Sequence, residues 1–147
     1  MVRRMSGKIQ RAATVFACVC AACAATADVS VPNLIGSNMV VQRGEGIHVW
    51  GWASPGEDVT VTLGDESATA TVETNGTWEV SLPPRPAGGP YTMTIAGENT
   101  VTLTNVMVGD VWLCSGQSNM QWPVSRSMNA TQEILSAHHP RIRLFSQ

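Results

Sequence analysis

One serine in this 147-residue chain has the sequence surroundings of a nucleophile. Ser118 follows Gly116 in a short polar turn, and this turn leaves an apolar run that ends at Cys114. A sharp turn after a buried strand exposes a serine hydroxyl, and a glycine before it lets the backbone bend tightly. The backbone N–H of Ser118 could also donate to a developing oxyanion. The pattern alone is weak evidence, because a serine in an ordinary surface turn has the same sequence.

The segments around Ser118 are those expected of an α/β sheet. Residues 106–108 and 111–114 are nearly continuous apolar runs, which is typical of a strand buried on both faces. Downstream, Asn129 and Gln132 have the spacing of a capping box, and the helix they predict ends before Pro140. Residues 141–145 then predict a second strand, so the order strand, turn, helix, strand indicates the start of an α/β domain.

The chain before residue 106 has a different pattern, of short strands separated by turns. Residues 59–63 alternate valine or leucine with threonine, which predicts a half-buried strand. Similar runs occupy residues 47–52, 68–72, 78–82, 91–95 and 101–103. Asn75-Gly76 predicts a tight hairpin, and the proline-rich residues 83–90 predict a stiff loop. About seven such strands favour an antiparallel β-sandwich of immunoglobulin-like type.

The first 27 residues have the layout of a secretory signal peptide. A basic start is followed by a small apolar run at residues 12–25, and Ala25-Thr26-Ala27 has the form that signal peptidase cuts. The apolar run is shorter than the about 20 residues that a membrane-spanning helix needs. A secreted or periplasmic location is therefore expected. The alternatives are a buried helix and a lipoprotein anchored at Cys23.

Removing that segment leaves an acidic protein, because all 11 acidic residues but only five of the nine basic ones remain. The resulting charge of −6 argues against nucleic acid or an anionic membrane as a partner, since both require basic patches. One cysteine remains, Cys114, so no internal disulfide is expected. Cys114 and the three histidines lack the spacing of metal ligands, and neither a metal nor another cofactor is predicted.

A longer block around Ser118 carries a family resemblance. The run Gly109-Asp110-Val111-Trp112-Leu113-Cys114-Ser115-Gly116-Gln117-Ser118-Asn119-Met120-Gln121-Trp122-Pro123 resembles the nucleophile block of the sialate O-acetylesterase family, carbohydrate esterases of the wider SGNH hydrolase group. Upstream, Leu34-Ile35-Gly36-Ser37-Asn38-Met39-Val40-Val41-Gln42-Arg43-Gly44 and Val49-Trp50-Gly51-Trp52-Ala53-Ser54-Pro55-Gly56-Glu57 resemble the N-terminal β domain of that family. The resemblance covers roughly residues 32–145.

The resemblance implies that Ser118 attacks the acetyl carbonyl of an O-acetylated sugar and forms an acetyl-enzyme that water hydrolyses. It also implies a glycine and an asparagine as further oxyanion donors, and a histidine base in a late Asp-x-x-His block. No Asp-x-x-His occurs in this sequence. We therefore expect a truncated chain, almost inactive alone, with a signal peptide at 1–27, a β-sandwich at 28–105 and an incomplete SGNH-type hydrolase domain at 106–147.

Three residues near Ser118 are weaker candidates for substrate binding. Gln117 and Asn119 flank the nucleophile and either line the site or support the turn. Trp122 could stack on a sugar ring, although we expect it to pack against other parts of the protein.

Structural roles are expected for four further residues. Trp50 and Trp52 fall on one face of a predicted strand, where core or interdomain packing is expected and a sugar-binding platform is the alternative. Asp110 is expected to be structural, and Cys114 to be a buried, inert thiol.

Two other functions remain open from the sequence. The same enzyme class could act on acetylated xylan or another glycan, because later loops would form most of the substrate pocket. A different class is a secreted β-sandwich that binds sugar or protein without catalysis, which the lack of a histidine base would favour.

Overall fold

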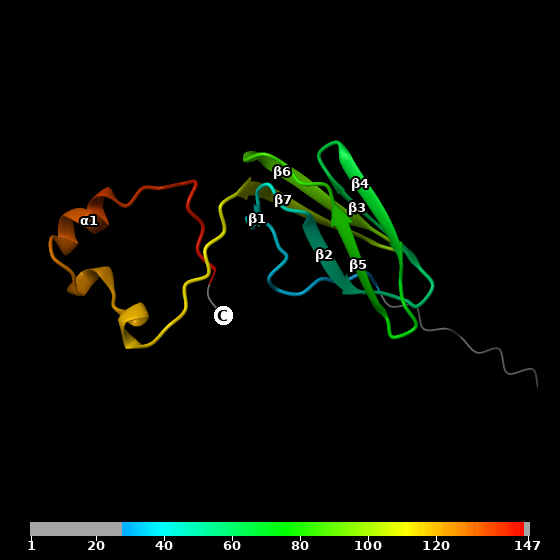
Figure 1. Ribbon diagram of the computed structural model, residues 1–147, viewed down its shortest axis with the longest axis horizontal. Coiled ribbons are helices and arrows are strands. Elements are labelled where there is room, and N and C mark those ends of the chain that lie inside the picture. The colour runs from blue at the N-terminus through cyan, green and yellow to red at the C-terminus, as the bar shows by residue number, and fades with distance from the viewer. Residues whose placement is uncertain (1–27, 146–147) are drawn as a thin grey trace, which may run out of the picture.

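The computed structural model describes residues 28–145, and its regular structure consists mostly of strands (Figure 1). The strands are β1 (Val40–Gln42), β2 (Ile47–Trp52), β3 (Asp58–Leu63), β4 (Glu66–Thr71), β5 (Thr77–Leu82), β6 (Gly88–Ala96) and β7 (Thr100–Gly109). They are followed by the 3-10 helices η1 (Ser118–Gln121) and η2 (Val124–Arg126) and by helix α1 (Ala130–Ser136). The predicted signal peptide, residues 1–27, lies outside the described residues.

The strands form two sheets, one of five strands in the order β1-β7-β6-β3-β4 and one of β2 and β5. Neighbouring strands are antiparallel except β1 and β7, which pair in parallel with Val41 opposite Val108. This pair departs from the antiparallel expectation. It also places the apolar residues 106–108 inside the five-stranded sheet, although the sequence favoured a separate parallel sheet for them. β7 ends at Gly109, four residues beyond the predicted boundary at residue 105.

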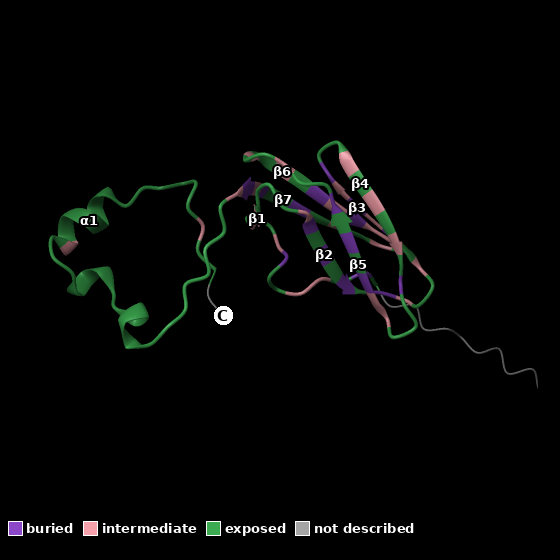
Figure 2. Ribbon diagram, viewed as in Figure 1, coloured by how far each residue is buried: buried purple, intermediate pink, exposed green. Residues whose placement is uncertain are grey.

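A single apolar core lies between the two sheets, and it follows from the alternation seen in the sequence (Figure 2). In β2 and β5 every second residue is buried, as the period of two in a strand requires. The core residues that are 3% exposed or less include Ile47, Val49, Val59, Val61, Leu63, Trp78, Val80, Leu82, Met93, Ile95 and Val106. Burying each aliphatic side chain contributes about 1.5–3 kcal/mol, so this cluster is the main source of stability.

The Asn75-Gly76 turn does not close the hairpin that the sequence predicted. It connects β4 of the larger sheet to β5 of the smaller one, and these two strands are not paired. The cause is Val72, which is only 3% exposed and exchanges two backbone hydrogen bonds with the loop before β3. Those bonds, from Val72 N–H to Glu57 O at 2.8 Å and from Gly56 N–H to Val72 O at 3.0 Å, turn the chain across the core.

Arg85 fastens the loop after β5 to the five-stranded sheet. Its guanidinium donates to the Leu63 carbonyl at 2.6 Å and to the Asp65 carboxylate at 2.8 Å, and lies 4.9 Å from the centre of the Tyr91 ring. A backbone hydrogen bond, followed by the bond from Arg85, lowers the pKa of Asp65, and the bond to Asp65 raises the pKa of Arg85. The proline-rich segment is therefore held in place, and its last three residues, Gly88 to Pro90, belong to β6 although a loop was predicted there.

Residues 110–145 lack the buried strands that the sequence predicted. Trp112 is 84% exposed, Leu113 is 94% exposed and Leu144 is 95% exposed, and no strand forms at 111–114 or 141–145. A strand needs a neighbour for its backbone hydrogen bonds, and none of the described residues pairs with either run.

Helix α1 confirms the predicted helix, but its start differs from the expected capping box. Asn129 is left-handed, with a φ of 57°, and its side chain makes no capping hydrogen bond. Its backbone carbonyl instead accepts the N–H of Gln132 at 3.0 Å. The helix ends at Ser136, before Pro140, as predicted.

We expect Leu63→Ala to lower the free energy of unfolding by about 2–5 kcal/mol, because it opens a cavity in the shared core. Urea denaturation followed by tryptophan fluorescence measures this change. Ser67→Ala, at an exposed position on neighbouring β4, should change it by no more than about 0.5 kcal/mol. Equal effects of the two substitutions would show that Leu63 is not part of a cooperative core.

Candidate active site

The segment that carries Ser118 begins directly at the end of β7, where two polar contacts fix its direction (Figure 1). The Arg43 side chain donates to the Asp110 carboxylate at 2.8 Å, and the Val111 N–H donates to Oε1 of Gln42 at 2.9 Å. Both partners lie at the end of β1, the strand that pairs with β7. The contact with Arg43 agrees with the structural role predicted for Asp110.

Ser118 begins η1, immediately after an unusual backbone conformation at Gly116. Gly116 has a φ of 156°, which side chains rarely tolerate, and a Cβ there would lie 2.8 Å from Cγ of Met120. The turn is closed by two hydrogen bonds, from Met120 N–H to Gln117 O at 2.9 Å and from Trp122 N–H to Asn119 O at 3.3 Å. This is the glycine-dependent tight turn that the sequence indicated.

Both reactive groups of Ser118 are open to an incoming molecule. The residue is exposed, and its backbone N–H is the first of η1, so no carbonyl within that helix can accept it. A hydroxyl and a free N–H on one residue are the parts needed for attack on a carbonyl and for one oxyanion contact.

No described residue supplies a base to Ser118. Its hydroxyl forms no hydrogen bond in residues 28–145, and the three histidines lie elsewhere. His48 is in β2 and contacts Glu79 at 3.0 Å, whereas His138 and His139 are exposed and follow α1. In the described part of the chain, Ser118 is therefore an exposed serine without a side-chain base in contact with its hydroxyl.

The three weaker candidates lie beside Ser118 in the same turn. Gln117 and Asn119 accept the two hydrogen bonds that close the turn, but with backbone carbonyls, so their exposed side chains remain available to a ligand. Trp122 is 57% exposed, which differs from the packing role expected for it.

Two further side-chain burials that the sequence suggested, Cys114 in a buried strand and Trp50 and Trp52 in the core, are absent from the described residues. Cys114 is exposed, because the run 111–114 is not a buried strand. Trp50 and Trp52 share one face of β2, as predicted, but they are 40% and 49% exposed and do not belong to the core.

Arg143 ties the far end of the segment back to the sheets, a contact that the sequence analysis missed. Its guanidinium donates to the carbonyls of Asn38 and Asn105 at 3.0 and 2.8 Å, and to the side-chain oxygen of Asn105 at 3.0 Å. Both asparagines have positive φ angles, 69° and 59°. Asparagine tolerates this conformation better than most residues. That preference was the one feature of the sequence that could have indicated unusual backbone at these two positions.

Two other kinds of site were sought within residues 28–145. No group of three or more His, Cys, Asp or Glu side chains there could hold a metal ion. No helix formed by those residues is long and apolar enough to cross a membrane.

Comparison with known proteins supports the resemblance found in the sequence. No family model matches the chain. Sialate O-acetylesterase from Mus musculus is 42% identical over 78% of this chain, and that from Homo sapiens is 40% identical over the same share. The chain spans about a quarter of these relatives, 24% of each. A crystal structure of a carbohydrate acetylesterase from Xanthomonas citri matches with a TM-score of 0.74 and 35% identity, over 77% of this chain and 26% of that one.

We expect Arg143→Ala to release residues 110–145 from the sheets, because it removes three hydrogen bonds at the edge formed by Asn38 and Asn105. Cleavage by chymotrypsin at the exposed Trp112 and Leu113 should become faster, while the core unfolds at an unchanged temperature. Arg141→Ala is the matched control, since Arg141 is exposed and makes no hydrogen bond in the described part of the chain. Equal cleavage rates for wild type and Arg143→Ala would contradict the anchoring role.

Proposed function

We propose that this chain, a relative of the sialate O-acetylesterases over most of its length, carries the nucleophile of a carbohydrate O-acetylesterase. The observation that supports this most directly is the position of Ser118. It is exposed at the first residue of η1, behind the constrained Gly116, in a chain whose relatives are named as esterases. The substrate class is an acetyl ester on a sugar hydroxyl.

The reaction proceeds through a covalent intermediate. A base removes the Ser118 proton as its Oγ attacks the acetyl carbonyl, and the Ser118 N–H donates to the oxygen that becomes negative. The tetrahedral species then breaks the bond between the acetyl carbon and the sugar oxygen, and this oxygen takes the proton from the protonated base and leaves as a hydroxyl group. Water attacks the acetyl-enzyme in the same way, releasing acetate and restoring the serine. No described residue contacts Ser118 as a base. We therefore assign this role to a histidine outside these 147 residues, and we expect the chain alone to be almost inactive.

Residues 106–147 are proposed as the start of an SGNH-type α/β domain, behind an immunoglobulin-like β-sandwich at 28–105. The exposed apolar side chains of Trp112, Leu113 and Leu144 support this. Such side chains gain free energy when other strands and helices cover them, at about 25 cal/mol for each Å² buried. The runs 111–114 and 141–145 then become neighbouring strands, and Ser118 lies at the end of the first.

Export to the periplasm or the cell exterior is part of the proposal, with cleavage after Ala27. The basic residues, apolar run and small-x-small site of residues 1–27 support it. An O-acetylated glycan outside the cell is then the accessible substrate.

The test joins this chain to a complete catalytic partner. In a chimera, the matched residues of this chain replace the corresponding segment of the Xanthomonas citri carbohydrate acetylesterase. Acetate release from a generic aryl acetate is then measured. We expect activity from the chimera and almost none from the 147-residue chain. Ser118→Ala in the chimera should lower kcat by roughly a thousandfold or more, because the nucleophile is lost.

Ser115→Ala is the matched control, an exposed serine three residues earlier in the same turn, and it should retain most activity. Circular dichroism confirms that each chimera is folded. Undiminished turnover by the Ser118→Ala chimera would remove Ser118 from the mechanism.

A further inference from the structure

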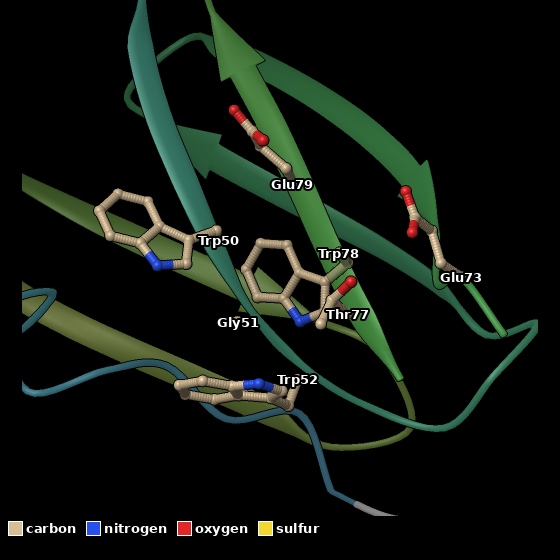
Figure 3. Close-up of a pocket in the computed structure, with 7 residues that line it drawn as sticks. All are labelled: Trp50, Gly51, Trp52, Glu73, Thr77, Trp78 and Glu79. Atoms are coloured by element: carbon tan, nitrogen blue, oxygen red, sulfur yellow. The ribbon is translucent and has the colours of Figure 1, made fainter. Parts of the chain in front are cut away.

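The outer face of the small β2–β5 sheet carries an aromatic pocket far from the Ser118 segment in the fold (Figures 1 and 3). Because Ile47, Val49 and Gly51 point to the core, the alternating residues His48, Trp50 and Trp52 point outward. The pocket has a volume of about 270 Å³ and is lined by Trp50, Gly51, Trp52, Glu73, Thr77, Trp78 and Glu79.

The two outward tryptophans present ring surface at an angle to one another. In Figure 3 the Trp52 ring is seen nearly edge-on, whereas the Trp50 ring is seen more from its face. They are 49% and 40% exposed. An exposed pair of large aromatic side chains has no packing function in the described structure, and such surfaces commonly mark binding sites.

The backbone holds these rings in place. Trp52 exchanges two hydrogen bonds with Ser30, at 2.9 and 3.0 Å, which fix the free edge of β2. Gly51, between the tryptophans, is required because a Cβ there would collide with the Ser30 carbonyl and lie 2.9 Å from the Trp78 ring. A ligand therefore meets a surface that is already ordered, which lowers the entropy cost of binding.

The pocket also contains hydrogen-bonding groups. The Glu79 carboxylate lies opposite Trp50 across the β2–β5 pair and is oriented by His48 at 3.0 Å. Glu73 and Thr77 add further acceptors at the rim. Trp78, also a lining residue, is 3% exposed, and its indole Nε1 has no acceptor among residues 28–145. Unsatisfied buried donors are rare and indicate a missing partner, such as an ordered water.

This combination selects one ligand chemistry. A sugar ring offers apolar C–H faces that contact indole rings, and hydroxyl groups that donate to carboxylates. The pocket has two carboxylates and no Lys or Arg in its lining, so a sugar that carries its own carboxylate is repelled. A neutral glycan satisfies both requirements.

We propose that the outer face of β2 and β5 is a binding site for a neutral glycan chain, separate from the acetyl-ester site at Ser118. This inference goes beyond the proposed esterase function and does not depend on it, because binding here requires only the β-sheets. The site would hold an uncharged part of a polysaccharide, not an acidic sialate residue.

Isothermal titration calorimetry on the 147-residue chain tests the proposal, with a neutral xylo-oligosaccharide and an oligomer of sialic acid as probes. We expect the neutral probe to bind and the acidic one not to bind. Trp50→Ala and Trp52→Ala should each weaken binding by about tenfold or more, the effect of losing an aromatic anchor. Trp112→Ala, which removes a tryptophan that is 84% exposed on the other segment, should leave the affinity unchanged.

The double variant Trp50→Phe/Trp52→Phe guards against loss of folding, because it retains smaller aromatic faces. It should bind with intermediate affinity. Ser118→Ala should bind the neutral probe as wild type does, so failure of the esterase proposal leaves this result untouched. Absence of binding to the neutral probe, equal binding of the acidic probe, or unchanged affinity in both Trp50→Ala and Trp52→Ala would each overturn the proposal.

Discussion

The two-stranded sheet of β2 and β5 depends on the five-stranded sheet behind it. A pair of strands alone is marginally stable in water, so it persists only because one face is covered. Ile47, Val49 and Leu82 supply that face, and each is 2% exposed or less. The period of two in a strand then determines which side chains lie on the opposite face, because every side chain next to a buried one points outward. The outward position of Trp50 and Trp52 is thus a consequence of the core, and the core also anchors β7, from which the Ser118 segment begins.

The Ser118 segment is held by a different kind of interaction. Residues 110–145 bury almost no apolar surface, and polar contacts at Arg43, Gln42 and Arg143 attach the segment to the sheets at its two ends. Such exposed contacts contribute little free energy, typically up to about 1 kcal/mol for an ion pair. They direct the chain without stabilising it strongly. The local turn at Gly116 and Ser118 nevertheless keeps its shape, because a backbone conformation that favours glycine and short-range hydrogen bonds determine it.

This difference explains how much the sequence could predict. Six strands were found by alternation, since half-burial leaves a pattern within the strand itself. β1 and its parallel pairing with β7 were missed, because three residues carry too little pattern and each partner residue lies 67 positions later in the chain. The Asn75-Gly76 turn was recognised, but not that it crosses between sheets, which burial of Val72 decides. At 111–114 an apolar run was predicted as a buried strand, but apolar character produces a strand only where a neighbouring strand accepts its hydrogen bonds. Ser118 was proposed as the nucleophile through a family resemblance, whereas the pocket on β2 and β5 required knowing which tryptophan face was uncovered.

The two proposed sites make different physical demands, and the chain meets each with the appropriate element. Glycan binding through ring contacts needs a rigid surface, which the Ser30–Trp52 hydrogen bonds and Gly51 provide. Ester cleavage needs an exposed serine that other groups can approach, which Ser118 at the start of η1 provides. On one polysaccharide the two would act together, because a chain held at β2 and β5 brings its acetyl groups to a high effective concentration near Ser118. That gain requires no conformational signal between the sites. It depends only on both being carried by one polypeptide and on a glycan long enough to reach from one to the other.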